Sequence, residues 1–78
     1  MPKLTSVTSS IISAVGYDSL TEELFVLFHS GDLYRYWGVP QDVYNGLLNA
    51  TSVGRYFSAY VRDQHSYEII EDHDLAVA

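Results

Sequence analysis

Residues 23–40 read ELFVLFHSGDLYRYWGVP and contain the strongest local structural signals in the chain. Two segments rich in aromatic and β-forming residues flank Ser30-Gly31-Asp32. This triplet is a hairpin signal, because glycine accepts a positive φ without steric cost. Pro40 ends the second segment, since proline has no N–H to donate to a sheet. The stretch therefore predicts two antiparallel strands joined by a tight turn.

The length of that turn decides which side chains share a face of the hairpin. A two-residue loop places Phe28 on the same face as Arg35 and Trp37. A three-residue loop with a bulge instead places Phe28 with Tyr34 and Tyr36. Both registers give a sheet with two apolar faces. Helices can cover one face, and the other must meet a partner, a ligand or a second copy.

The rest of the chain predicts one more strand and two helices. Residues 9–19 favour an extended segment, and residues 40–50 and 52–63 carry apolar side chains at helical spacing. Residues 65–70 suit either a short edge strand or an irregular ending. This order predicts an α+β fold, in which a small three-stranded antiparallel sheet is followed by two helices packed on one face (β-β-β-α-α).

The length of 78 residues suits a single domain. We expect a flexible lead-in over residues 1–6, the domain itself over residues 7–70 and an acidic tail over residues 71–78. Termini of this kind are usually solvated and poorly ordered.

The charge balance limits the partners. Four Lys and Arg stand against ten Asp and Glu, which gives a formal net charge of −6. Proteins that follow a nucleic-acid backbone gain affinity from cations that neutralise its phosphates. The balance therefore disfavours long RNA or DNA, but it is compatible with a small anionic ligand held by one or two arginines.

Cysteine usage and hydropathy indicate a cytoplasmic protein. The chain has no cysteine, which fits a reducing compartment and excludes a thiolate metal site. Its longest apolar run is far below the roughly 20 residues that span a bilayer, and no signal peptide is visible. We expect no membrane association.

Sequence patterns of catalysis are missing from the chain. It contains neither a GxSxG nucleophile motif nor a GxxxxGK[ST] phosphate loop. His65 and His73 lack the spacing that organises metal ligands. We therefore expect a protein that is not an enzyme, with no catalytic residue, metal or cofactor.

The first candidate binding site is the aromatic segment Tyr34, Arg35, Tyr36 and Trp37. Its rings could stack on nucleic-acid bases, and its arginine adds a cation. Alternation along a strand sends Arg35 to the face opposite the tyrosines unless the backbone bulges. The alternative is that the rings fill the core, where large aromatic side chains dominate the burial in a small domain.

The second candidate is the start of the second helix, at Ser52, Gly54 and Arg55. Unpaired backbone N–H groups and the helix dipole attract anions at such a position. Gly54 would permit close approach of a ligand, and Arg55 could make a bidentate contact with phosphate. The alternative is a serine N-cap followed by a glycine that packs closely.

Together these motifs resemble the KTSC domain over residues 7–67. The resemblance rests on Tyr34-Arg35-Tyr36 followed by Val39-Pro40 and then Ser52 and Gly54. Further matching positions are Val7, Ser9, Ser10, Tyr17, Asp18, Leu24, Val26, Phe28, Gly31, Tyr44, Leu47, Leu48, Ala50, Tyr56, Phe57 and Arg62. The family is named for a segment at the C-terminus of some lysyl-tRNA synthetases, and it also occurs as small free-standing bacterial and phage proteins. The resemblance implies a non-catalytic module for which RNA binding has been proposed.

Two functional hypotheses follow. The first is a module that binds or sequesters a nucleotide or a short single-stranded RNA through the aromatic strand and the helix start. The second is a protein-interaction or homo-oligomerisation module, most simply a homodimer, with the same aromatic residues in its interface.

Overall fold

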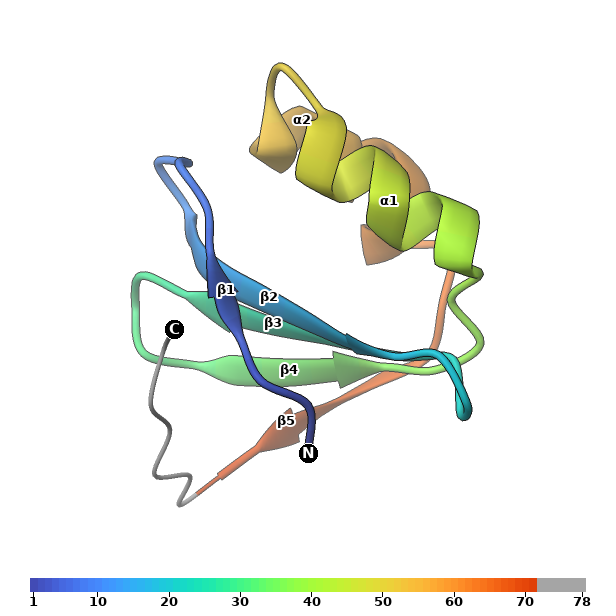
Figure 1. Cartoon of the computed structure of the whole chain (residues 1–78). Helices are drawn as coiled ribbons and strands as arrows, with labels where there is room; N and C mark the ends of the chain where they lie inside the picture. The colour runs from blue at the N-terminus through green and yellow to red at the C-terminus, as the bar shows by residue number, and fades with distance from the viewer. Residues whose placement is uncertain (72–78) are drawn as a thin grey trace.

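A computed structural model describes residues 1–71 of the chain (Figure 1). The expected α+β class is confirmed, but the sheet has five antiparallel strands rather than the predicted three, in the order β1-β2-β3-β4-β5. The strands are β1 (Thr5–Ser6), β2 (Ile12–Asp18), β3 (Glu23–Phe28), β4 (Leu33–Tyr36) and β5 (Tyr67–Ile70).

The two strands beyond the predicted three are those at the edges of the sheet. β1 has only two residues, both exposed and polar, so it carries no alternating pattern that a sequence could reveal. For residues 65–70 the sequence allowed either an edge strand or an irregular ending, and β5 is that edge strand. It pairs with β4, so the chain returns to the sheet after the helices.

The turn between β3 and β4 follows the three-residue register. Phe28 N–H donates to the Asp32 carbonyl, and Gly31 N–H donates to the Phe28 carbonyl, each over 2.9 Å. Gly31 has a φ of +96°, which a residue with a Cβ rarely adopts. Val26 therefore lies opposite Tyr34 in the ladder, and the tyrosines of β4 share the face of Phe28.

Both helices cover this face of the sheet (Figure 1). α1 (Gln41–Asn49) begins directly after Pro40. α2 (Val53–Phe57) begins after Ser52 and continues without a break into a π-helical turn, η1 (Ser58–Arg62). The buried residues between the sheet and the helices are Ile12, Val15, Leu24, Val26, Tyr36, Val39, Leu47, Val53, Phe57 and Val61.

The opposite face of the sheet has a smaller apolar cluster, formed by Leu4, Ala14, Phe25 and Leu33. Leu4 comes from the segment expected to be a flexible lead-in, yet only 1% of its surface is exposed. It lies against Gly16, where a Cβ would come within 2.8 Å of Leu4 Cδ2. The N-terminal residues thus help to cover the second apolar face. Residues 72–78 of the predicted acidic tail lie outside the described part of the chain.

Candidate functional site

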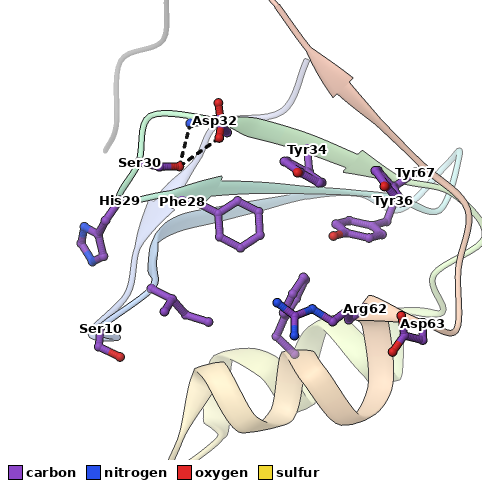
Figure 2. A pocket seen from close by; sticks show the side chains of 12 residues that line it. Ser10, Phe28, His29, Ser30, Asp32, Tyr34, Tyr36, Arg62, Asp63 and Tyr67 are labelled. Carbon is purple, nitrogen blue, oxygen red and sulfur yellow. Dashed lines mark hydrogen bonds between the residues drawn. The ribbon is translucent and has the colours of Figure 1, made fainter.

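A groove of about 650 Å³ opens between the helix-covered face of the sheet and η1 (Figure 2). We call it the aromatic groove. Its lining residues are Ser10, Ile11, Phe28, His29, Ser30, Asp32, Tyr34, Tyr36, Phe57, Arg62, Asp63 and Tyr67. They come from the β1–β2 connection, the β3–β4 hairpin, α2, η1 and β5, so the groove exists only in the folded chain.

Five aromatic rings form the wall of the groove. Tyr34 stacks on Tyr67 of the neighbouring strand, with ring centroids 5.2 Å apart and planes 20° from parallel. Tyr34 also meets the edge of Phe28 at 5.1 Å, and Tyr36 meets Phe57 edge-on at 5.6 Å. Stacked and edge-to-face arrangements are the geometries that aromatic pairs prefer. The wall is therefore a continuous surface of packed aromatic rings.

Tyr36 is the most buried tyrosine of this wall, with 3% of its surface exposed. Burial, followed by the neighbouring phenols of Tyr34 and Tyr67, raises its pKa to about 12. The Arg62 guanidinium acts in the opposite direction. The hydroxyl therefore stays protonated at neutral pH, and it can donate a hydrogen bond to a ligand.

Arg62 supplies the positive charge of the groove. Figure 2 shows its side chain reaching from η1 toward the space in front of the rings. Among the described residues, the ion pairs within 4 Å all involve Arg35, and none involves Arg62. π-Helical turns such as η1 are rare in proteins overall, but those that occur are frequently found at functional sites. Arg62 is thus placed to meet an anionic group on a ligand.

Polar groups of the hairpin turn form the far end of the groove (Figure 2). His29 Nε2 lies 2.8 Å from the Ser9 carbonyl oxygen, and Ser30 Oγ donates to Asp32 Oδ2 over 3.1 Å. This end therefore combines a carboxylate with hydroxyl and imidazole groups. The two ends of the groove differ in charge.

The aromatic segment predicted as a site divides between the two faces of the sheet. Tyr34 and Tyr36 line the groove, whereas Arg35 and Trp37 lie on the opposite face. There the Arg35 guanidinium is 5.3 Å from the Trp37 ring and pairs with Glu68 and, at 3.5 Å, with Glu23. Its charge is already compensated by these two carboxylates.

The predicted site at the start of α2 is not part of the groove lining. The Ser52 hydroxyl accepts a hydrogen bond from Arg55 N–H over 3.3 Å, so it caps the helix. A Cβ on Gly54 would lie 3.5 Å from Ile11, an ordinary packing distance. Arg55 is exposed. The geometry of Ser52 and Gly54 corresponds to the cap and packing roles described above.

Apart from Tyr34 and Tyr36, none of the twelve groove residues was among the predicted site residues. The aromatic and cationic residues missed are Phe28, Phe57, Arg62 and Tyr67. The register of the hairpin pointed to Phe28, because a three-residue loop joins it to Tyr34 and Tyr36. Tyr67 had no comparable signal, since its position depends on how the chain pairs β5 with β4 after the helices.

Within residues 1–71, no group of three His, Cys, Asp or Glu side chains is arranged to hold a metal ion. No helix in this part of the chain has the length and apolar character needed to cross a membrane.

The fold and the groove define a small α+β domain with an aromatic ligand-sized depression. Residues 8–67 match the family model of the KTSC domain, and the chain belongs to the KTSC domain family. The predicted resemblance is thus confirmed. The crystal structure of a KTSC domain protein from Yersinia pestis superposes with a TM-score of 0.87 at 28% identity, over 90% of this chain and 99% of that chain.

Sequence relatives are of two kinds. An uncharacterized protein of Stutzerimonas stutzeri is 43% identical over 63 residues, which is 81% of this chain and 89% of that protein. A lysine–tRNA ligase of a Nostoc species is 41% identical over 59 residues, which is 76% of this chain but only 10% of the ligase. The same domain therefore occurs in a small protein and as a minor part of a large enzyme.

Proposed function

We propose that this protein is a non-catalytic module that binds a nucleotide or a short single-stranded RNA in the aromatic groove. One observation supports the proposal most strongly. The stacked Tyr34 and Tyr67 rings form a wall of the groove, and Arg62 lines the same groove. Aromatic rings bind bases by stacking, worth about 1–3 kcal/mol per base. An arginine that forms no ion pair with the described residues, as Arg62 here, is available to bind phosphate.

The size of the groove supports a compact ligand. Pockets for small ligands typically measure roughly 300–1,000 Å³, and the aromatic groove holds about 650 Å³. The net charge of −6 opposes a long nucleic acid, which would bring many phosphates to a surface with few cations. The occurrence of this domain in a lysine–tRNA ligase is consistent with an RNA partner.

The proposal is tested by thermal shift with AMP, CMP, GMP, UMP and short single-stranded RNAs. A ligand at a hundred times its dissociation constant should stabilise the fold by about 2.7 kcal/mol, which is easily measured. Tyr67→Ala should weaken binding by about 1–3 kcal/mol through lost stacking. Tyr60→Ala is the matched control, because Tyr60 is 54% exposed and Tyr67 is 53% exposed, but Tyr60 does not line the groove.

A second pair of variants tests the cation. Arg62→Gln should weaken the binding of phosphate-containing ligands. Arg55→Gln removes the same charge from an exposed position outside the groove, so it should leave their binding unchanged. The proposal fails if no nucleotide or RNA shifts the melting temperature. It also fails if the groove variants and their controls lose the same affinity.

The second candidate function is self-association, and the exposed edge of the sheet favours it. Tyr67 and Ile69 of β5 are 53% and 48% exposed on an edge strand, and such edges can pair with a second copy. Light scattering on the free protein separates the two candidates. A dimer that dissociates on Ile69→Lys supports self-association, and a monomer at all concentrations excludes it.

A further inference from the structure

The charged side chains around the aromatic groove are few and unequal in sign. Arg62 is positive, Asp63 and Asp32 are negative, and His29 is formally neutral at pH 7. The groove therefore carries one full positive charge against two negative charges. The chain as a whole is also negative, with a formal net charge of −6.

Phosphate groups differ in the charge that they bring to such a groove. A phosphodiester carries one negative charge per phosphate, whereas a terminal phosphate monoester carries about −1.5 to −2 at pH 7, because its second pKa is near 6. Arg62 can compensate one charge. Any further charge would enter a groove whose lining includes the carboxylate of Asp63, the next residue in the chain, and that of Asp32.

The remaining donors near Arg62 are neutral. Tyr36 and Tyr67 both line the groove with ring centroids 5.7 Å apart, and no hydrogen bond among the described residues occupies the Tyr36 hydroxyl. A phenol can donate to a phosphate oxygen, but it cannot compensate a full charge. One arginine and neutral phenols therefore balance a singly charged phosphate better than a more highly charged one.

We infer that the aromatic groove selects phosphodiesters, such as an internucleotide linkage within a strand, over terminal mono-, di- and triphosphates. This inference rests on the proposed function and narrows it to the class of phosphate. In this inference Arg62 attracts the first negative charge of the ligand. Asp63, the next residue, disfavours ligands that carry additional negative charge.

The test is isothermal titration calorimetry at fixed ionic strength in EDTA, with two pairs of probes for each of the four bases. The first pair is the dinucleotide NpN and its 5′-phosphorylated form pNpN. The second pair is the 3′,5′-cyclic mononucleotide and the nucleoside triphosphate. Each pair keeps the bases constant and changes the phosphate charge. The less charged member of each pair should bind at least tenfold more tightly.

Two variants test whether Asp63 causes the preference for the less charged probe. Asp63→Asn should reduce the preference for the less charged probe several-fold, whereas Asp42→Asn on α1, outside the groove, should leave it unchanged. Tighter or equal binding of pNpN or the triphosphate overturns the inference while leaving the proposed function standing. A preference that persists unchanged in Asp63→Asn also overturns it. An absence of binding by every probe overturns both the inference and the proposed function.

Discussion

The arginines differ in what surrounds them, and this difference decides which one can meet a ligand. Arg35 was a candidate ligand-binding residue because it lies between two tyrosines in the sequence. In the structure its guanidinium contacts two carboxylates and the Trp37 ring. Arg62 stands in an unremarkable helical pattern, yet it reaches the groove. Strand alternation correctly separated Arg35 from the tyrosines. No local pattern identified Arg62, because its placement depends on how η1 sits over the sheet.

Tyr36 gives a pH prediction at the residue scale. Its pKa is about 12 in the fold and 10.0 ordinarily, so the unfolded chain loses this proton more easily. The stabilising contribution is fully present below pH 10, and it is lost as the pH rises from 10 to about 12. Tyr36→Phe should therefore show a smaller loss of unfolding free energy than the wild type over this range.

Urea denaturation at pH 9, 10 and 11 measures the effect. If the wild type and Tyr36→Phe lose stability in parallel across this range, the phenol does not ionise more readily in the unfolded chain, and the assigned pKa shift is incorrect.

At the scale of elements, the central hairpin and both helices were predictable, and the edge strands were not. The hairpin has strong local signals, namely two apolar runs and a glycine that adopts a positive φ. The register remained open because it depends on one residue of loop length. β1 escaped prediction because two exposed polar residues carry no pattern, and its anchor is the preceding Leu4 rather than the strand itself.

Leu4 tests whether the N-terminal segment belongs to the fold. Leu4→Ala removes a side chain that is 1% exposed, and such changes typically cost 2–5 kcal/mol. Because the segment lies near the first residue and can relax, we expect the free energy of unfolding to fall by about 2 kcal/mol. Leu20→Ala is the matched control, since Leu20 is 94% exposed and its truncation should change stability by less than about 0.5 kcal/mol.

Chemical denaturation compares the two leucine variants directly. Equal stability of Leu4→Ala and Leu20→Ala would show that residues 1–6 contribute nothing to the fold, as a flexible lead-in requires.

At the scale of the whole molecule, the groove depends on contacts between residues far apart in the chain. Tyr36 and Tyr67 are paired across β4 and β5, although both helices separate them in sequence. A sequence read without the sheet topology shows Tyr34 and Tyr36 as candidates, because they are adjacent to a hairpin signal. It cannot show that Tyr67 completes the same wall, because that depends on the pairing of β5 with β4.

Ligand binding in the aromatic groove is best tested by NMR chemical-shift mapping with a short single-stranded RNA dinucleotide. Binding in the aromatic groove predicts that the largest amide shifts fall on β4, β5 and η1, at residues such as Tyr34, Tyr67 and Arg62. Shifts confined to the opposite face around Trp37, or to the start of α2 at Ser52, would place the ligand elsewhere and contradict the proposal.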